Sequence, residues 1–408
     1  MATYTVQPKD TLYSIAKKFN LSVDQLKQFN GLYDNNISIG QVLKVSLSGS
    51  STYSDPVYPN NSPVYPSNEP VYPNNSPVYP SNDPVYPSTP SSNYVGGTTS
   101  GGGAAKSISS FVVRKENRGS YNSITISYPT DYGTDSTGTM RDNYPSPNMV
   151  NPRGVSYFGK STFDSQRYHF EDLLPRPFYA DVLHFIGKNE GSFDAVNSYD
   201  KAIFSFGFIQ FTGAIASGSI LSKVLQRMKQ NQSDAFYNCF EQFGIDVTSY
   251  GAAVVSVNGY SGDAAFSTIA NDLQLTGVFI ASGFEREMIR AQIQIAQEEY
   301  MNKALSDATG IGIFGQQVPL NKILYSEGGI ALRVDLAVNR GLSGSLAVLQ
   351  KAITQTASAQ GIYNASGLGA IDERSVVQAV INNDAEQWKR DRTQKLLNSS
   401  FSFDKYYS

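Results

Sequence analysis

Two carboxylates and a hydroxyl group in the middle of the chain have the spacing of an acid–base site. Glu190 follows a stretch with helical periodicity, and Asp200 and Ser205 come shortly after it in a stretch that alternates like a strand. A carboxyl group at the C-terminal end of a helix meets the negative end of the helix dipole, which disfavours its ionised form. A carboxylic acid that keeps its proton near neutral pH can act as a general acid in cleaving a glycosidic bond. Asp200 would be the second carboxylate, and Asp194 competes with it for that place.

A helix followed by a β-hairpin is expected to position these groups. The helix would begin at Pro177, because proline suits the first helical position, and end at Gly191, which suits a left-handed cap. Residues 194–199 and 203–211 would form the two strands, with Asp200 near the turn. The apolar side chains that would form the buried face of the helix are Phe178, Val182, Phe185 and Ile186.

Two further residues of the expected hairpin could contact a sugar. Gly207 would share a strand face with Ser205, and because it has no side chain a sugar could approach the strand closely. Gln210 would point to the opposite face, where it could bond to a sugar or to the backbone. The hairpin is therefore expected to form one wall of a binding cleft beside Glu190.

This stretch resembles the active-site region of the lysozyme superfamily, and the phage-type lysozymes in particular. In those enzymes a Glu-Gly pair ends a helix, an Asp follows on the hairpin, and a hydroxyl residue stands two before a glycine. The matching residues are Glu190-Gly191, Asp200 and Ser205-x-Gly207. Residues 205–210 also resemble the Gly-x-x-Gln strand of lytic transglycosylases. Residues 331–341 resemble the helix that ends in Asn-Arg-Gly in lysozyme-like enzymes, here Asn339, Arg340 and Gly341.

The resemblance implies a role for each matching residue. Glu190 would protonate the glycosidic oxygen, and Asp200 would activate the attacking water or stabilise the oxocarbenium-like transition state. Ser205 would help to position that water. In a lytic transglycosylase Glu190 would act alone, first as acid and then as base, and the sugar's own hydroxyl would attack. The residues expected to bind the substrate are Gly207, Gln210, Asn339 and Arg340.

Residues 1–47 have the pattern of a small βααβ module. Alternation around Tyr4 predicts a first strand, apolar residues at helical spacing predict two helices, and residues 37–45 predict a returning strand. The module resembles a LysM domain, except that Lys9 stands where that family usually has glycine. The matching residues are Tyr4-x-Val6, Asp10-Thr11-Leu12, Ile15-Ala16, Leu26, Asn30-x-Leu32 and Ile39-Gly40-Gln41-x-Leu43-x-Val45.

The LysM resemblance implies binding of N-acetylglucosamine polymers, and of peptidoglycan glycan strands above all. The sugars would lie in a shallow groove between two loops. The loop residues expected to line it are Asp10, Thr11, Leu12 and Ile37. Loop amides can bond acetamido groups there, and apolar side chains can cover sugar faces.

Residues 48–106 have the composition of a disordered linker. Pro-Val-Tyr-Pro recurs every seven residues from Pro56 to Pro84, and a glycine-rich stretch follows from Gly96. Frequent proline prevents a helix and removes the donors that a sheet needs. We therefore expect an extended, polyproline-like tether between the module and residues 107–408.

The composition excludes several classes of site and partner. The net charge is −3, whereas a nucleic-acid-binding protein needs clustered Lys and Arg. With one cysteine and two histidines, neither a disulfide within the chain nor a cysteine or histidine metal cluster is expected, and no cofactor is implied. No ordinary signal peptide is visible, and no apolar run approaches the ~20 residues that span a bilayer. The sequence predicts synthesis in the cytoplasm and non-standard delivery to the cell wall.

The sequence as a whole predicts an α+β protein, with a mainly helical, lysozyme-like domain at residues 107–408. Helices are expected at 216–230, 233–244, 283–306, 328–340, 343–358 and 374–398, a strand region at 108–128 and a surface loop at 129–160.

Three functions remain open from the sequence. The first is a muramidase that acts as an endolysin or as an exported effector, with an export machine or an immunity protein as partner. The second is a non-catalytic wall-binding component of a phage tail or contractile injection machine, and the third is a chitinase- or chitosanase-like glycosidase.

Overall fold

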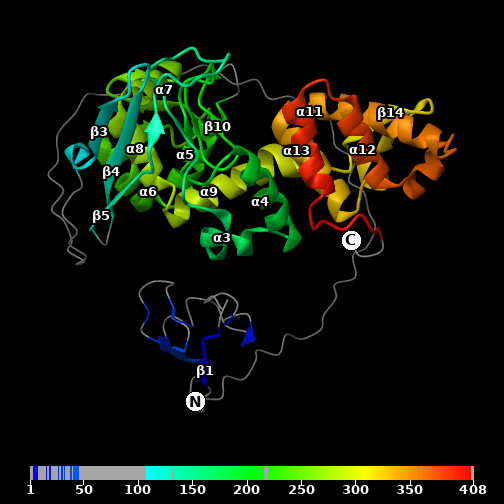
Figure 1. The fold of residues 1–408 in the computed structure, drawn as a ribbon, viewed down its shortest axis with the longest axis horizontal. Coiled ribbons are helices and arrows are strands. Elements are labelled where there is room, and N and C mark those ends of the chain that lie inside the picture. Colours follow the sequence, from blue (N-terminus) through cyan, green and yellow to red (C-terminus); the bar gives the residue numbers. More distant parts are fainter. Residues whose placement is uncertain are drawn as a thin grey trace, which may run out of the picture. The chain divides into compact units, whose positions relative to one another are not determined.

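The computed structural model divides into two compact units, residues 1–102 and 103–408 (Figure 1). The residues that the structure describes are 3–7, 15, 18–19, 26, 29–30, 32, 37–38, 40–45, 107–130, 133–215 and 219–405. The linker expected at residues 48–106 lies outside them. So do Asp10, Thr11 and Leu12 of the expected sugar groove.

The first unit joins its two ends in an antiparallel pair of strands. Strand β1 (Thr3–Thr5) pairs with β2 (Val42–Lys44), so that Tyr4 lies opposite Leu43. The Asn30 side chain holds β2 in place, because its amide donates to the Lys44 carbonyl over 2.9 Å and its oxygen accepts from the Lys44 amide over 2.6 Å. The buried side chains described in this unit are Val6, Ile15, Leu26, Leu43 and Val45. The strands expected at both ends of the module are therefore present, with an apolar core between them.

The second unit contains an antiparallel sheet that joins segments far apart in the sequence. Its strand order is β10-β9-β8-β7-β6-β4-β3, with β5 paired to β4. The strands are β3 (Val112–Asn117), β4 (Asn122–Thr130), β5 (Gly133–Ser136), β6 (Met140–Arg141), β7 (Ser156–Tyr157), β8 (Val196–Asn197), β9 (Ser205–Phe206) and β10 (Phe211–Thr212). The expected strand region and the expected hairpin thus belong to one sheet. Residues 129–160, expected to be a surface loop, supply β5, β6 and β7.

Helices surround this sheet and form a second lobe beside it (Figure 1). The helices are α3 (Phe163–Gln166), α4 (Phe178–Glu190), α5 (Ile220–Asn231), α6 (Ser233–Cys239), α7 (Asp263–Asn271), α8 (Leu273–Ser282), α9 (Arg286–Ala296), α10 (Asn302–Leu305), α11 (Glu327–Ala359), α12 (Glu373–Asn383) and α13 (Gln387–Leu397). A small three-stranded sheet has the order β11 (Ile245–Val247), β12 (Val255–Val257) and β13 (Tyr260–Ser261), and a two-stranded one pairs β14 (Gly310–Ile313) with β15 (Gln316–Pro319). Figure 1 shows α11 to α13 and β14 on one side, and the main sheet with α3 to α9 on the other.

The helices of the second lobe are broken at two points, of which the sequence predicted one. The backbone of α11 leaves the helical region at Gly341, with φ of 68°, as expected from helices at 328–340 and 343–358. Residues 374–398, expected to be one helix, form α12 and α13 instead. The break comes at Asp384, which has an extended backbone and whose carboxylate accepts from Arg340 Nη2 over 2.6 Å. The helix thus ends at Asp384, where the side chain forms an ion pair with Arg340 of α11.

An aromatic core lies beneath the end of α4. The ring centroid of Phe163 is 4.7 Å from that of Phe193 and 4.9 Å from that of Phe208, and all three side chains are buried. Phe193 follows α4, while Phe208 belongs to the turn between β9 and β10. Packing of these rings fixes the helix end against that turn.

The buried phenols of Tyr128 and Tyr157 should make the second unit sensitive to alkali. Burial raises the pKa of Tyr128, as does the charge of Asp135, and burial and the charge of Asp194 raise the pKa of Tyr157. The folded state therefore keeps both protons, so its stability is fully present below the ordinary pKa of 10.0 and is lost as the pH rises above it. The unfolding free energy of the wild type should fall as the pH rises from about 9 to about 11. In Tyr157→Phe the slope of this fall should be smaller, by up to ~1.4 kcal/mol per pH unit. Chemical denaturation of both proteins across that range measures the difference, and parallel curves would contradict the expectation.

Candidate active site

Glu190 is the last residue of α4, as the sequence predicts. The Gly191 amide donates to the Gly187 carbonyl over 2.8 Å, and Gly191 ends the helix with φ of 156°, an open conformation instead of a left-handed helical one. A Cβ atom at Gly191 would lie 2.5 Å from the Cβ of Ala195, so the next residue must be glycine for the chain to turn here. The Glu190 side chain is 23% exposed. It is therefore accessible from the surface while held at a fixed helix end.

Gln210 lies beside this helix end. Its side-chain Nε2 donates to the Gly207 carbonyl over 3.0 Å and lies 3.5 Å from the point that a Cβ of Gly191 would occupy. Gln210 has φ of 54° and closes a turn from Gly207, which divides the strand expected at 203–211 into β9 and β10. The structure thus brings Gln210 to the end of α4, through a turn that strand alternation did not predict.

Gly207 is in close contact with another helix. It has φ of 86°, and a Cβ there would lie 2.2 Å from Oε1 of Gln292 in α9. Gln292 is fully buried; its Nε2 donates to the Phe193 carbonyl over 2.9 Å and its Oε1 accepts from the Phe208 amide over 3.2 Å. Position 207 therefore requires glycine because the side chain of Gln292 packs directly against its backbone.

The hairpin residues Asp200 and Ser205 make mainly local contacts. The Asp200 carboxylate accepts from Asn197 Nδ2 over 3.0 Å and from the Ala202 amide over 2.9 Å, and so closes its own turn. Ser205 pairs with Asn197 on one side and with Thr212 on the other, and it is 3% exposed. Asp200 is half-buried and Ser205 is buried within the sheet.

Asp194, the competing carboxylate, is completely buried. Its oxygens accept from the Lys160 amide over 2.9 Å, the Ser161 amide over 2.8 Å and the Tyr157 hydroxyl over 3.1 Å. Burial raises the pKa of Asp194, although these hydrogen bonds oppose the rise. The contacts assign Asp194 to holding the loop that follows β7.

The main partner of Glu190 is Arg392 of α13, which the sequence did not indicate. Arg392 Nη1 donates to Glu190 Oε1, while its Nε and Nη2 donate to Asp335 Oδ1 of α11 over 3.0 and 2.8 Å. The side chains of Arg392 and Asp335 are 8% and 2% exposed. Burial by itself lowers the pKa of Arg392, but the charges and hydrogen bonds of Asp335 and Glu190 outweigh it and raise that pKa above its ordinary value. One guanidinium therefore ties α4 to α11 and α13.

Asn339 and Arg340 lie at the end of the first part of α11, just before the break at Gly341. Asn339 comes one helical turn after Asp335 and so shares its face of the helix. Arg340 is 14% exposed and pairs with Asp384. The resemblance implied substrate binding for both residues; the contact that the structure gives Arg340 is an ion pair between helices.

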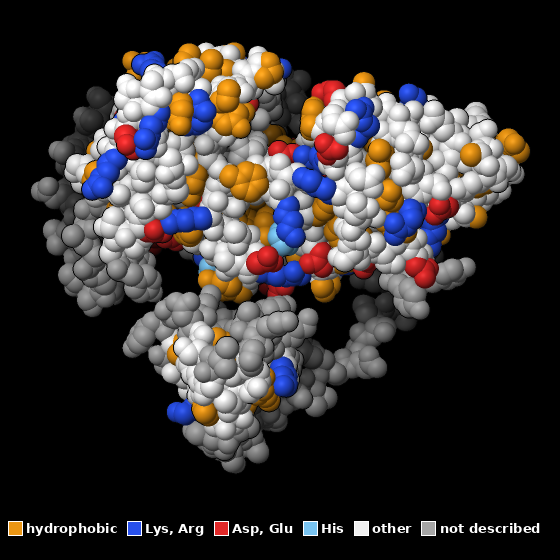
Figure 2. All heavy atoms as spheres, in the orientation of Figure 1, with side chains coloured by type: hydrophobic (Ala, Val, Ile, Leu, Met, Phe, Trp, Pro, Cys, Tyr) orange, Lys and Arg blue, Asp and Glu red, His pale blue; other side chains and the backbone are white. Residues whose placement is uncertain are grey.

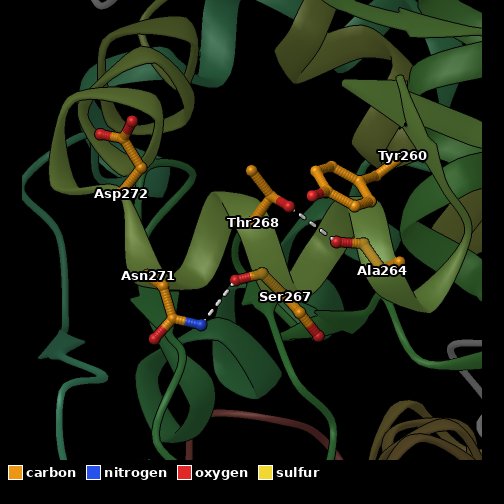
Figure 3. Close-up of a pocket in the computed structure, with 6 residues that line it drawn as sticks. All are labelled: Tyr260, Ala264, Ser267, Thr268, Asn271 and Asp272. Atoms are coloured by element: carbon orange, nitrogen blue, oxygen red, sulfur yellow. Dashed lines mark hydrogen bonds between the residues drawn. The ribbon is translucent and has the colours of Figure 1, made fainter. Parts of the chain in front are cut away.

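A separate hollow of about 540 Å³ opens beside α7 (Figure 3). Figure 3 shows the Thr268 hydroxyl donating to the Ala264 carbonyl and the Asn271 amide donating to the Ser267 carbonyl, over 2.9 and 2.8 Å. Asp272 accepts from the Gln274 amide and caps α8. These polar groups stabilise their own helices and offer no pair of free carboxylates. The hollow is lined by Tyr260, Ala264, Ser267, Thr268, Asn271 and Asp272.

The described part of the chain contains neither a metal-binding cluster nor a membrane-spanning helix. There, the His, Cys, Asp and Glu side chains form no group of three or more that could hold a metal ion. Likewise, none of the helices described is both long enough and apolar enough to cross a membrane.

In the first unit, the loop expected to line the sugar groove is braced from within. The Ser38 amide donates to Gln41 Oε1 over 2.9 Å. The Val6 amide donates to the Gln41 carbonyl, and the Gly40 amide donates to the Val6 carbonyl, both over 2.8 Å. Ile37 is half-buried.

The family model of the LysM domain matches residues 4–46. These residues form a LysM domain. Residues 4–46 are accordingly a peptidoglycan-binding domain.

Known proteins resemble the chain over this module. It is 52% identical over 50 residues to the N-acetylmuramoyl-L-alanine amidase sle1 of Staphylococcus saprophyticus, which is 12% of this chain and 15% of that protein. It is 42% identical over 50 residues to the probable peptidoglycan endopeptidase LytE of Bacillus subtilis, or 12% and 14% of the two chains. The amidase sle1 of Staphylococcus aureus USA300 is 40% identical over 60 residues, or 15% and 18%. The chain thus spans less than a fifth of these relatives. No solved structure matches it.

Proposed function

We propose that the protein is a muramidase that cleaves the peptidoglycan glycan strand between N-acetylmuramic acid and N-acetylglucosamine. The observation that carries the proposal is the position of Glu190. It ends α4 with a partly exposed side chain, next to Gly191 and Gln210, and the hairpin follows directly. A carboxyl group fixed at a helix end beside a surface turn can reach a glycosidic oxygen and donate a proton to it. The LysM domain would hold the enzyme on its substrate.

Arg392 gives Glu190 a fixed orientation in this mechanism. It is itself held by Asp335, so the carboxyl group is positioned before a substrate binds. Asp200 would be the second carboxylate and Ser205 a residue that helps to position water. Asp200 bonds within its own turn, and Ser205 is buried in the sheet, so that the hairpin would have to open for Ser205 to reach a water molecule beside the sugar.

The position of Gln210 supports lytic transglycosylation as a second candidate reaction. There Glu190 would act as acid and then as base without a second carboxylate, and the Gly207-x-x-Gln210 turn would face the sugar. Gln210 lies beside Gly191, whereas Asp200 and Ser205 are engaged locally. The substrate and the bond broken are the same in both reactions.

The Glu190–Arg392 ion pair supports a non-catalytic alternative. A carboxylate that is paired with a buried guanidinium also fits a purely structural role, as in a wall-binding component of a phage tail or injection machine. The relatives' names, an amidase and an endopeptidase, favour an enzyme of the cell wall instead. A chitinase- or chitosanase-like activity would use the same groups on a related polymer.

Analysis of the products separates these functions. Purified peptidoglycan is incubated with the protein, and the soluble fragments are identified by mass spectrometry. Muropeptides with new reducing N-acetylmuramic acid ends are expected from hydrolysis, and anhydro-muramyl ends from transglycosylation. Free peptides without new glycan ends would contradict both and indicate amide-bond cleavage. Wall binding without any release would support the non-catalytic alternative.

A further inference from the structure

The hollow beside α7 is a surface feature that the proposed muramidase mechanism does not use (Figure 3). Its volume of about 540 Å³ falls in the range of ~300–1,000 Å³ that is usual for the sites of small ligands. Figure 3 shows Tyr260 and Asp272 at its two ends, and the short side chains of the outer face of α7 leave room between them. The opposite face of α7 is buried in the core, so this wall of the hollow is rigid. The residues of the outer face are Ala264, Ser267, Thr268 and Asn271.

Tyr260 presents an aromatic ring at one end of the hollow and is 55% exposed. It begins β13 directly after Asn258 and Gly259, whose φ angles of 51° and 82° are those of a tight turn between β12 and β13. Figure 3 shows the Tyr260 side chain over the first part of α7, pointing toward Thr268. A tyrosine held on so short a hairpin offers a flat surface that loses little conformational entropy when a ligand covers it.

Polar groups that can bond a ligand line the rest of the hollow. Within the described residues, neither the Tyr260 hydroxyl nor the Ser267 hydroxyl has a hydrogen-bond partner. The Asn271 side chain bonds the Ser267 carbonyl through its nitrogen, so its oxygen can accept from a ligand. Asp272 accepts from the Gln274 amide through Oδ1 over 2.9 Å, so its Oδ2 can accept as well. The hollow thus offers two hydroxyl groups and two acceptor oxygens beside an aromatic ring.

The charge of the lining favours a neutral, hydroxyl-rich ligand. None of the six described residues that line the hollow is Lys or Arg, and Asp272 adds a carboxylate. A phosphate group or the carboxylates of a wall peptide would therefore meet a like charge without a compensating cation. A pyranose fits better, because its C–H face can cover the Tyr260 ring while its hydroxyl groups bond the surrounding oxygens.

We propose that this hollow is a second glycan-binding site, which takes a short N-acetylglucosamine-containing segment with one pyranose ring on Tyr260. Hydroxyl or acetamido groups of the segment bond Ser267 and Asn271. The site goes beyond the proposed function, because it requires nothing of Glu190. Its outer face extends roughly 10 Å along α7, from Ala264 to Asn271, which sets the length of the bound segment. The LysM domain binds peptidoglycan, so strands that it holds are offered to the hollow at high effective concentration.

Moving the single tryptophan of the chain to the hollow gives a signal for binding at this site alone. The full-length protein with Tyr260→Trp and Trp388→Phe is titrated with the tetramer of N-acetylglucosamine, and tryptophan emission is recorded. Both positions are exposed, and tryptophan keeps a flat ring for stacking. The LysM domain contains no tryptophan, so its own binding contributes no emission. A saturable change in emission is expected.

A pair of matched variants locates the ligand. Ser267→Leu, added to this protein, should raise the half-saturation concentration about tenfold or more, because it removes a hydroxyl group and fills the middle of the hollow. Ser358→Leu, the same change at an exposed position near the end of α11, should leave it unchanged.

Three results would overturn the proposal. The first is an emission that stays constant throughout the titration of a protein whose circular dichroism matches the wild type. The second is a titration that Ser267→Leu leaves unchanged or that Ser358→Leu weakens equally. The third is a saturable change with a wall stem peptide and none with the tetramer, which would assign the hollow to an anionic peptide. Because the tetramer lacks N-acetylmuramic acid, each of these results stands whether or not the protein is a muramidase.

Discussion

Replacing Glu190 with glutamine is expected to lower kcat for glycan cleavage about 10²- to 10⁴-fold, the usual contribution of a general acid. Glutamine keeps the size of the side chain and an oxygen that can accept from Arg392, but it has no proton of suitable acidity to donate. Peptidoglycan binding should be unchanged, because the LysM domain belongs to the other unit. Release of soluble muropeptides from purified walls measures the first effect, and sedimentation with the walls measures the second.

A matched variant separates loss of the acid from loss of one negative charge. Glu116 is 65% exposed and pairs with Arg118, and Glu116→Gln changes the charge by the same amount on β3, at the opposite edge of the sheet from the hairpin. We expect it to keep wild-type activity. Cleavage by Glu190→Gln at the wild-type rate would exclude Glu190 as the acid and assign the proton donation to another group.

The parts of the fold that the sequence predicted are those set by neighbouring residues. Pro177 and Gly191 mark the two ends of α4, and Gly341 marks the break in α11, because proline and glycine act through their own backbone angles. The LysM domain was predicted for the same reason, since its strands and helix faces follow one another within a short stretch.

The parts that the sequence did not predict depend on distant partners. Strands β6 and β7 contain two residues each, too few to show alternation, and form only because β4 and β8 flank them. Helix α8 was missed because most of its residues are buried, so it shows no polar face.

The contacts of the candidate site likewise join residues that are far apart in the sequence, and so they were not predicted. Periodicity indicates that Asp335 lies on a helix but not that Arg392, 57 residues later, binds it, nor that Arg392 binds Glu190 across 202 residues. A signal was present, because Arg333 and Asp335 interrupt an otherwise apolar stretch, and a charge buried among apolar residues needs a partner. For Gly207 the sequence led to the prediction that a sugar could approach the strand closely, whereas the group that approaches it in the structure is the side chain of Gln292.

Replacing Asp335 with leucine is expected to lower the unfolding free energy of the second unit by about 3–5 kcal/mol. The buried guanidinium of Arg392 would lose the partner of its Nε and Nη2 atoms and keep only Glu190. A buried guanidinium whose Nε and Nη2 lose their acceptor, and which keeps one of two carboxylate partners, is destabilised by more than the lost contact itself. Chemical denaturation followed by the emission of Trp388, which lies on α13 with Arg392, reports the transition of this unit.

The double variant Asp335→Leu with Arg392→Met should recover most of that loss, because apolar side chains of similar size can replace a buried ion pair at little cost. Glu116→Ala supplies the control, since it breaks a pair whose side chains are 50% and 65% exposed, and it should change stability by less than about 1 kcal/mol. A double variant no more stable than Asp335→Leu would contradict the expectation, because the cost would then come from packing instead of from the incompletely bonded guanidinium. The double variant also frees Glu190 from its only described cation. If Arg392 orients the acid, this double variant should regain stability and still cleave the glycan more slowly than the wild type, which separates the role of Arg392 in the fold from its role in orienting the Glu190 carboxyl group.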